Sequence, residues 1–228
     1  MNKIAIRVDA SNLIGTGHVM RCLSLAQELR RRGSQVQFIY RAHPGHMADM
    51  IAREGFELSL LPESEQASQN EIDQEGYAAW LGVTEEEDAE QTLDALGSEP
   101  CDLLIVDHYS LDSRWERNLR LHVNKIMAID DLANRTHDCN LLLDQNYFNE
   151  PEKRYKGLLP EHCDTLLGPK YALLRPEFRK ARNFCRMRGG GIARVLIYFG
   201  GNDPDNLTGM ALEAMSEKSL SHLLVDAV

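Results

Sequence analysis

The first residues able to take part in chemistry lie in a glycine-bearing loop, Gly15-Thr16-Gly17-His18. Glycines let backbone N–H groups approach a ligand, and the N-terminus of a helix favours negative charge. A neutral imidazole at His18 could accept a proton from water, and the positive end of the helix dipole favours that neutral form. The alternative is a capping or packed histidine beside a tight turn, which the pattern alone slightly favours.

A second polar group, Asp107-His108-Tyr109, directly follows the apolar run from Leu103 to Val106. Polar side chains at the carboxyl end of a strand face the edge where open α/β sheets bind ligands. Tyr109 could hydrogen-bond a sugar or a leaving oxygen, and Asp107 could hold a histidine in one tautomer. Solvated polar residues at a strand end explain the three equally well.

A third group is the glycine turn Gly200-Gly201, with the polar residues Asp203 and Asn206 after it. Between a strand and a helix, such a turn can hold a diphosphate through backbone amides. It is not a Walker loop, because no Gly-Lys-Ser/Thr follows. An ordinary turn with Asp205 or Asn206 as helix N-cap is the alternative, and it explains the turn better when the turn is taken alone.

Two weaker features offer metal or sugar ligands. His43 and His46 stand three residues apart, but no third ligand accompanies them. A solvated pair is therefore the better interpretation, and we expect no metal site and no cofactor. The acidic pair Asp130-Asp131 could bind a cation or sugar hydroxyls, although such a pair at a strand end is more often part of a turn.

The composition excludes several classes of protein. The chain has 228 residues, is 43% hydrophobic and carries a net charge of −10. It therefore lacks the positive charge that general nucleic-acid binding needs. Arg7 and Asp9 interrupt the N-terminal apolar stretch, and no apolar run approaches the ~20 residues that span a bilayer. We expect a cytoplasmic protein with no membrane or nucleic-acid partner, and we favour a monomer.

Cysteine usage agrees with a reducing compartment. The five cysteines are odd in number and include no C-x-x-C pair. We interpret all of them as reduced thiols. They are Cys22, Cys101, Cys139, Cys163 and Cys185.

The elements that must position these groups alternate between strands and helices. Such alternation predicts a doubly wound α/β domain with a parallel sheet. The predicted strands are Lys3 to Val8, Val36 to Tyr40, Glu57 to Leu61, Leu103 to Val106 and Lys125 to Ile129. The predicted helices are Val19 to Leu29, Met47 to Glu54, Glu85 to Leu96 and Ser113 to His122, with a loop from Glu63 to Glu75.

The tail of the chain predicts the start of a second domain. A basic helical stretch from Glu177 to Arg188 precedes three glycines, which are typical of a linker. A strand, a helix and a further strand are then predicted at Val195 to Phe199, Asn206 to Met215 and Leu223 to Val225. We place the first domain at residues 1–188 and the truncated start of the second at 189–228.

Taken together, these segments resemble the UDP-2,4-diacetamido-2,4,6-trideoxy-β-L-altropyranose hydrolases of pseudaminic acid biosynthesis. Each motif alone is modest, but their order is that of the family and they span nearly the whole chain. They are Arg7-Val8-Asp9, Gly15-Thr16-Gly17-His18-Val19-Met20-Arg21-Cys22, Val106-Asp107-His108-Tyr109, Asp130-Asp131, Leu142-Leu143-Asp144-Gln145-Asn146, the segment from Gly168 to Phe178, and the segment from Gly200 to Leu207.

The resemblance implies a glycosyltransferase B-type fold and a metal-independent hydrolysis of a UDP-linked sugar to UDP and free sugar. Water attacks the anomeric carbon with inversion, with His18 as general base and Tyr109 as the active-site tyrosine. The substrate-binding residues that it implies are Arg7, Asp9, Gly15, Gly17, Arg21, Asp107, His108, Tyr171 and Arg175. The nucleotide-binding residues are Gly200, Gly201, Asp203 and Asn206.

The C-terminus departs from that family. The chain ends at Val228, soon after the second domain begins. Family members continue, and most uracil, ribose and diphosphate contacts are expected in that remainder. If the polypeptide is complete, we expect weak or no UDP-sugar binding and no turnover. If it is a fragment of a longer product, the full hydrolase interpretation holds.

Two other functions fit the same residues. A glycosyltransferase of the same fold also carries a glycine loop after its first strand, and its UDP release would require an acceptor. A truncated, non-catalytic sugar-binding domain would bind free sugar without releasing UDP. The motif around His18 together with Asp107-His108-Tyr109 favours the hydrolase.

Overall fold

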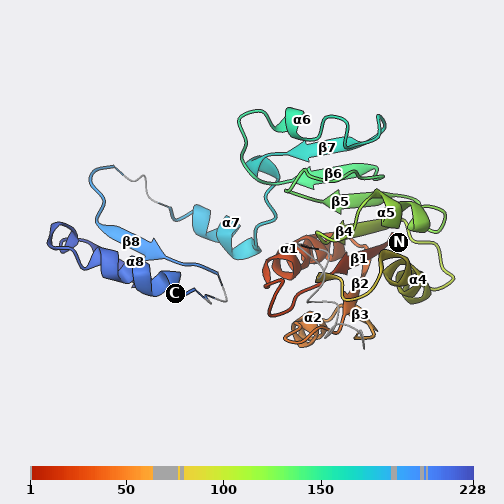
Figure 1. The fold of residues 1–228 in the computed structure, drawn as a ribbon, viewed down its shortest axis with the longest axis horizontal. Coiled ribbons are helices and arrows are strands. Elements are labelled where there is room, and N and C mark those ends of the chain that lie inside the picture. Colours follow the sequence, from red (N-terminus) through yellow and green to blue (C-terminus); the bar gives the residue numbers. More distant parts are fainter. Residues whose placement is uncertain (1, 64–76, 78–79, 186–188, 201–202, 204) are drawn as a thin grey trace. The chain divides into compact units, whose positions relative to one another are not determined.

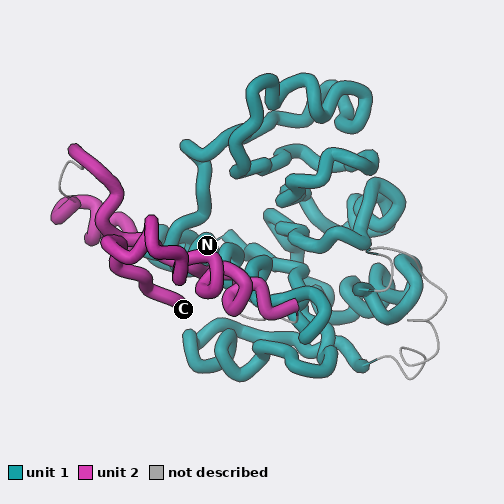
Figure 2. The backbone as a smooth tube through the Cα atoms, turned by 60° about the vertical axis from the view of Figure 1, so that its left-hand side comes forward, with its two compact units in different colours: residues 1–176 teal, residues 177–228 magenta. Residues whose placement is uncertain are grey.

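The computed structural model describes residues 2–63, 77, 80–185, 189–200, 203 and 205–228. Contacts divide the chain into two compact units, Met1–Pro176 and Glu177–Val228 (Figure 2). The domain boundary that we expect after residue 188 stays a prediction. The loop expected from Glu63 to Glu75 lies, after its first residue, outside the described residues.

Unit 1 is built on a seven-stranded parallel sheet with the strand order β3-β2-β1-β4-β5-β6-β7 (Figure 1). All five strands predicted for this part of the chain form, with ends that agree to within a residue or two. The strands are β1 (Lys3–Val8), β2 (Gln35–Arg41), β3 (Glu57–Leu61), β4 (Leu103–Asp107), β5 (Ile126–Ile129), β6 (Leu141–Asp144) and β7 (Asp164–Leu167).

Two apolar cores cover the two faces of this sheet. Along β4, Leu104 and Val106 pack into one core and Ile105 into the other, because successive strand side chains point to opposite faces. One core includes residues of the helices α4 (Glu85–Leu96) and α5 (Ser113–Leu119), and the other includes residues of α1 (Gly17–Arg31) and α2 (Ala48–Arg53). Burial on both faces explains why these strands are nearly continuous apolar runs.

The helix α4 forms where the sequence predicts it, and its ends show why. The Thr84 side chain accepts a hydrogen bond from the Glu87 backbone N–H at 3.1 Å, as an N-cap does. Four acidic residues occupy the first turn and complement the helix dipole. Gly97, with φ of 70°, ends the helix in the left-handed region that glycine tolerates.

A buried ionic network ties α4 to the sheet. Asp88 is fully buried and accepts bonds from Arg7 Nη2 at 2.6 Å and Arg41 Nη2 at 2.6 Å. The indole Nε1–H of Trp115 donates to the same carboxylate at 3.0 Å. Burial raises the pKa of Asp88, but Arg7 and Arg41 outweigh it and hold that pKa below its ordinary value. The carboxylate therefore stays ionised and links two strands and two helices.

Three parts of the chain differ from the prediction. The strands β6 and β7 were not predicted, because the segment between them holds only the four-residue helix α6 (Pro151–Arg154) and so lacks a clear strand–helix alternation. The helix α5 ends at Leu119, three residues early. The helix α7 (Pro176–Arg182) is shorter than the basic stretch that predicted it, whose last residues, 186–188, lie outside the described ones. The 3₁₀ turn η2 (Pro169–Tyr171) follows β7.

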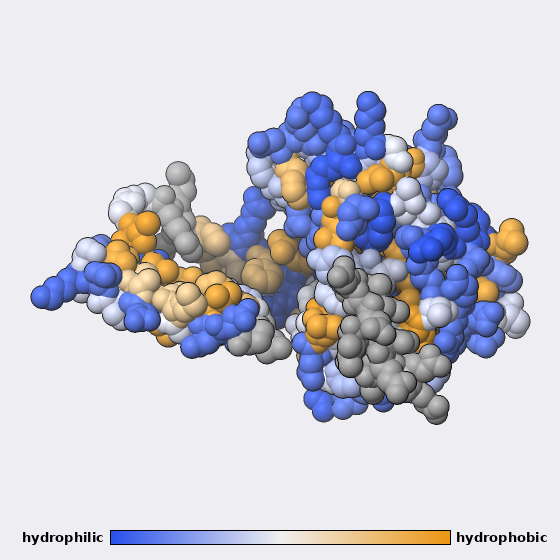
Figure 3. All heavy atoms as spheres, viewed as in Figure 1, coloured by the Kyte–Doolittle hydropathy of each residue, from blue (hydrophilic) through white to orange (hydrophobic). Residues whose placement is uncertain are grey.

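Unit 2 contains the βαβ start that the sequence predicts. The strands β8 (Arg194–Ile197) and β9 (Leu224–Ala227) are parallel, and α8 (Leu207–Met215) connects them, followed by the 3₁₀ turn η3 (Lys218–Leu220). Leu196 and Leu224 are 69% and 68% exposed, and apolar side chains are visible on this unit in Figure 3. Within the described part of the chain, no helix combines the length and the apolar character needed to cross a membrane.

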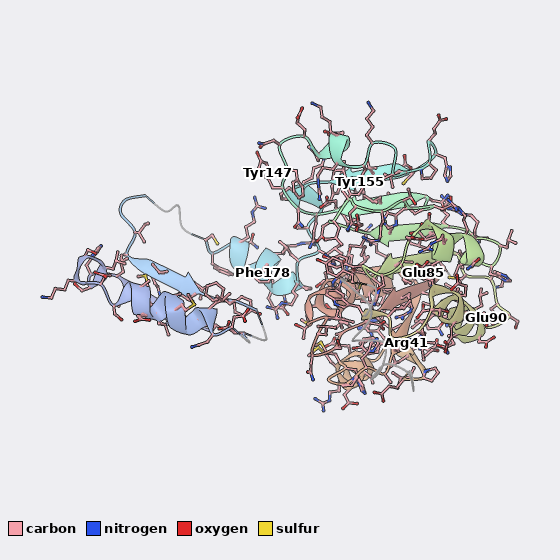
Figure 4. All side chains as sticks on the ribbon, viewed as in Figure 1. Arg41, Glu85, Glu90, Tyr147, Tyr155 and Phe178 are labelled. Carbon is pink, nitrogen blue, oxygen red and sulfur yellow. The ribbon has the colours of Figure 1, made fainter. Side chains whose placement is uncertain are left out.

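We predict that Asp88→Asn destabilises unit 1 by about 3–5 kcal/mol, because buried Arg41 then lacks its countercharge and Arg7 keeps only Asp9. Urea unfolding followed by fluorescence measures the loss. Glu90→Gln is the matched control, since Glu90 lies on the same helix but is exposed at the edge of the unit, whereas Arg41 lies within it (Figure 4). Equal stability of the two variants would contradict the role given to Asp88.

Candidate active site

The candidate site lies where the strand order of the sheet reverses. β1 pairs with β2 on one side and with β4 on the other, and Val8 at the end of β1 is the partner of Asp107 at the end of β4. The loop after β1 leads to Gly17, where α1 begins. Ligands of open α/β sheets bind at such a switch point, outside the carboxyl ends of the strands.

His18 and Arg21 both contact the carboxylate of Asp107. His18 Nδ1 lies 2.6 Å from Asp107 Oδ1, and Arg21 donates from Nε and Nη2 to the two Asp107 oxygens, each at 2.6 Å. Burial raises the pKa of Asp107, but His18 and Arg21 outweigh it and hold that pKa below its ordinary value. An ionised Asp107 accepts the Nδ1–H of His18, which leaves Nε2 as the ring nitrogen able to take a proton.

The position of α1 explains why these side chains converge. His18, Arg21 and Cys22 are separated by three and four residues, so they share one face of the helix. The Cys22 thiol donates to Asp107 Oδ2 at 3.4 Å. Burial raises the pKa of Cys22 well above its ordinary value, and the neighbouring carboxylate raises it further. Cys22 is therefore a neutral packing group and not a nucleophile.

Tyr109 stands edge-on to the imidazole of His18, with ring centroids 4.6 Å apart and an interplanar angle of 82°. Its hydroxyl donates to Asp131 Oδ1 at 2.5 Å. Burial raises the pKa of Tyr109, and the hydrogen bond to Asp131 raises it further, so the phenol keeps its proton at neutral pH. Asp131 Oδ2 also lies 3.4 Å from Arg21 Nη1, which links the Tyr109 pair to the His18 pair.

Two aromatic residues join this group without any signal in the sequence pattern. The rings of Trp80 and Tyr109 stack with centroids 5.5 Å apart, and Tyr77 meets Trp80 edge-on at 4.7 Å. Trp80 also lies 6.1 Å from the ring of His18. No predicted element contains Tyr77 or Trp80, and only the tertiary fold brings them to His18.

Asp131 is held by residues that follow β6. Asn146 Nδ2 donates to Asp131 Oδ2 at 3.2 Å, and Arg154 Nη2 donates to the Asp131 backbone oxygen at 2.6 Å. Arg154 also forms an ion pair with Asp144. Figure 4 shows Tyr147 and Tyr155 in the connection between β6 and β7. The sequence indicated Asp130-Asp131 as a possible ligand pair, but it did not indicate that Asp131 binds Tyr109.

Arg7, Asp9 and His108 lie beneath the site rather than on it. Asp9 is fully buried and accepts from Arg7 Nη1 at 2.6 Å, and His108 Nε2 lies 3.3 Å from its other oxygen. Burial lowers the pKa of His108, although Asp9 favours the charged ring. His43 Nε2 also approaches Asp9, at 3.6 Å. Arg7, Asp9 and His108 were expected to bind substrate, but they expose almost no surface. Their contacts with one another position the ends of β1 and β4 instead.

The possible metal ligands His43 and His46 both lie in the described part of the chain. His43 is buried against Asp9, whereas His46 is exposed and its Nδ1 accepts from the Ala48 backbone N–H at 3.3 Å. The two histidines therefore occupy different surroundings and do not act as a pair. Over the described residues, no group of three or more His, Cys, Asp or Glu side chains is arranged to hold a metal ion.

The remaining expected sugar ligands occupy two separate segments. Gly15, with φ of 77°, closes a turn through its N–H to the Ser11 oxygen at 2.9 Å, and Gly17 begins α1 beside His18. Tyr171 is half-buried in η2 and packs against the core on the α1 face, and Arg175 is exposed. Their contacts with a substrate stay predictions.

In unit 2, side chains of the turn before α8 accept hydrogen bonds from the first backbone N–H groups of that helix. The Asp203 carboxylate accepts from the Leu207 and Thr208 backbone N–H groups at 2.8 and 2.9 Å. Asn206 is the N-cap and accepts from the Gly209 N–H at 3.2 Å. Gly200 has φ of 94°, and Gly201 lies outside the described residues. The amides expected to hold a diphosphate are thus capped by side chains, and their nucleotide role stays a prediction.

Fold and site together define an α/β protein with a Rossmann-like parallel sheet and a polar group at its switch point. This confirms the fold class expected from the sequence. The crystal structure of Acinetobacter baumannii MurG resembles the chain with a TM-score of 0.54. The match covers 100% of this chain and 67% of MurG at 12% sequence identity, so it supports the fold alone.

Sequence comparison supports the resemblance noted above. The chain is 28% identical over 207 residues to the UDP-2,4-diacetamido-2,4,6-trideoxy-β-L-altropyranose hydrolase of Campylobacter jejuni, covering 90% of the chain and 63% of that protein. It is also 28% identical over 220 residues to the uncharacterized protein MJ1062 of Methanocaldococcus jannaschii, covering 95% of the chain and 40% of that protein. The chain therefore spans less than two thirds of these relatives. No protein-family model matches it.

We predict that Asp107→Asn lowers the free energy of unfolding by about 3–5 kcal/mol at neutral pH, because Arg21 loses its buried countercharge. The native pKa of Asp107 lies below its ordinary value of 3.8. The stabilising effect of its charge is therefore present above that value and is lost as the pH falls toward the native pKa. Urea unfolding at neutral pH and at about pH 3.5 measures this. The difference from wild type shrinks in acid, whereas the exposed control Asp94→Asn shows little change at either pH.

Proposed function

We propose that this chain supplies the sugar-side catalytic half of a hydrolase that cleaves a UDP-linked 2,4-diacetamido-2,4,6-trideoxy sugar. Water attacks the anomeric carbon with inversion, and the products are UDP and the free sugar. The sequence similarity to the Campylobacter jejuni hydrolase supports the substrate class. The contact of His18 Nδ1 with buried Asp107 is the observation that carries the mechanism.

His18 acts as the general base in this proposal. Asp107 fixes the tautomer in which Nδ1 carries the hydrogen, so Nε2 presents its lone pair to a water molecule. Asp107 also stabilises the imidazolium that forms when the water loses its proton. Arg21 neutralises the carboxylate from its other side and keeps it from taking that proton.

Tyr109 contributes a neutral phenol beside the base. Its hydroxyl donates to Asp131, so the hydroxyl oxygen is left to accept a hydrogen bond from a sugar hydroxyl or amide. The rings of Tyr77, Trp80 and Tyr109 supply apolar surface on which a deoxy sugar and its acetamido methyl groups can rest. Such contacts orient the anomeric carbon toward the water that His18 activates.

Departure of UDP needs donors that meet the growing charge on its diphosphate. We assign this task to the turn at Gly200 and the start of α8, where Asp203 and Asn206 now cap the backbone amides. A bound diphosphate would have to displace the Asp203 carboxylate. The relatives extend well beyond the region matched by this chain, so the nucleotide contacts of the whole enzyme stay a proposal.

We predict that His18→Ala reduces UDP release from the UDP-linked diacetamido sugar by about 10²–10⁴-fold, the contribution of a general base. Release is followed by a coupled UDP assay, and NMR of the first-formed sugar reports inversion. The matched control is His162→Ala, because His162 is exposed and lies before β7. Release by His18→Ala equal to a measurable release by the wild-type chain would contradict the proposal. Release that needs an acceptor would indicate a glycosyltransferase instead.

We predict that Asp131→Ala and Tyr109→Phe impair the same step, each lowering kcat by about 10-fold or more with a smaller change in KM. Asp131→Ala removes the acceptor that orients the Tyr109 hydroxyl, and Tyr109→Phe removes the hydroxyl itself. Because both changes break one hydrogen bond, the double variant is expected to lose little more than either single variant. Independent, multiplicative losses would contradict a shared role.

A further inference from the structure

Two cysteine thiols face each other at the amino ends of β6 and β7. Cys139 precedes β6 by two residues, and Cys163 directly precedes β7. Their sulfur atoms lie 3.6 Å apart although 24 positions separate them in the sequence. The two strands are hydrogen-bonded neighbours, with Leu141 opposite Asp164. Cys163 therefore lies beside Asn140, one residue from Cys139, and the short sulfur separation puts the two side chains within reach of a disulfide.

The two sulfurs have different surroundings. Cys139 is fully buried in the core that covers the α4 face of the sheet. Cys163 is half-buried at the margin of that core, where an oxidant in solution can reach it. A hydrogen bond from the Cys139 thiol lowers the pKa of Cys163 and raises that of Cys139. Cys163 is therefore the thiol that reacts first, because the thiolate is the nucleophile.

We propose that Cys139 and Cys163 form a reversible disulfide when the protein meets hydrogen peroxide. The Cys163 thiolate attacks one peroxide oxygen, so that an S–O bond forms, the O–O bond breaks and hydroxide leaves. The Cys139 sulfur then attacks the Cys163 sulfur, the S–O bond breaks, and the departing hydroxide takes the Cys139 proton as water. Overall, two thiols and one peroxide give one disulfide and two waters.

The disulfide would act on the part of the chain that supports the candidate site. It closes the segment from Cys139 to Cys163, which contains Asn146 and Arg154, and both of these side chains hold Asp131. A cross-link restricts the unfolded chain more than the folded one. We expect oxidation to raise the Tm of the protein by roughly 5–10 °C.

The test is peptide mapping of the native chain after treatment with hydrogen peroxide. Free thiols are alkylated under denaturing conditions, and the digest is analysed by mass spectrometry. We expect a cross-linked pair of peptides containing Cys139 and Cys163, lighter by two hydrogens and separated again by dithiothreitol. Buried Cys22 and Cys101 serve as internal controls that stay alkylatable, and exposed Cys185 reports that the oxidant was active.

Variants separate this reaction from general oxidation. A Cys185→Ser background prevents cross-linking between molecules. In that background, Cys163→Ser and Cys139→Ser should each abolish the peroxide-induced rise in Tm, and Cys139→Ser should leave Cys163 to oxidise to sulfinic acid. The proposal is overturned if Cys139 and Cys163 both remain free in the native chain while Cys185 is consumed. It is equally overturned if Cys163 is over-oxidised there without pairing. Both readouts are independent of hydrolase activity.

Discussion

The buried negative charge of Asp107 is the constraint on which the rest of the site depends. A carboxylate without exposure to water needs strong donors on both oxygens, and His18 and Arg21 supply them at 2.6 Å. This requires that α1 begin at Gly17, so that both donors face the end of β4. The same requirement fixes the imidazole tautomer, and thus the lone pair available for chemistry.

A second buried charge keeps that geometry in place. Asp88 binds Arg7 and Arg41 on neighbouring strands, and Arg7 binds Asp9 in turn. These groups do not contribute exposed surface, yet they determine how β1 and β2 lie against α4. The same interaction, a buried carboxylate hydrogen-bonded by arginine, therefore serves two functions. At Asp88 it holds the sheet together, and at Asp107 it orients a histidine.

The electrostatics of the group around His18 are compatible with the base-catalysed hydrolysis that we propose. Asp107 is held ionised and Tyr109 is held neutral. Arg21 contacts both Asp107 and Asp131, the carboxylate that binds Tyr109. The site thus combines a fixed anion, an imidazole and a phenol. Inverting hydrolysis with a good leaving group requires an oriented water and little other proton transfer, which is what such a set can provide.

The sequence by itself determined the local structure and part of the chemistry. Apolar runs predicted five of the seven strands of unit 1, and the sequence predicted α4 with both of its ends. Polar residues after β1 and β4 indicated His18 and Asp107, because parallel strands end at the same edge. These features depend on neighbours in the chain, and periodicity and capping report such neighbours directly.

Only the tertiary structure decided which distant groups meet. Asp131 receives the Tyr109 hydroxyl, and Trp80 stacks on Tyr109, through contacts between segments that no local pattern connects. Arg7 and Asp9 carried a family motif, but the fold buries both because Asp88 and His108 lie where those side chains end. Strand pairing and helix packing determine these contacts. A single sequence contains both residues of each contact but does not show which residues pair.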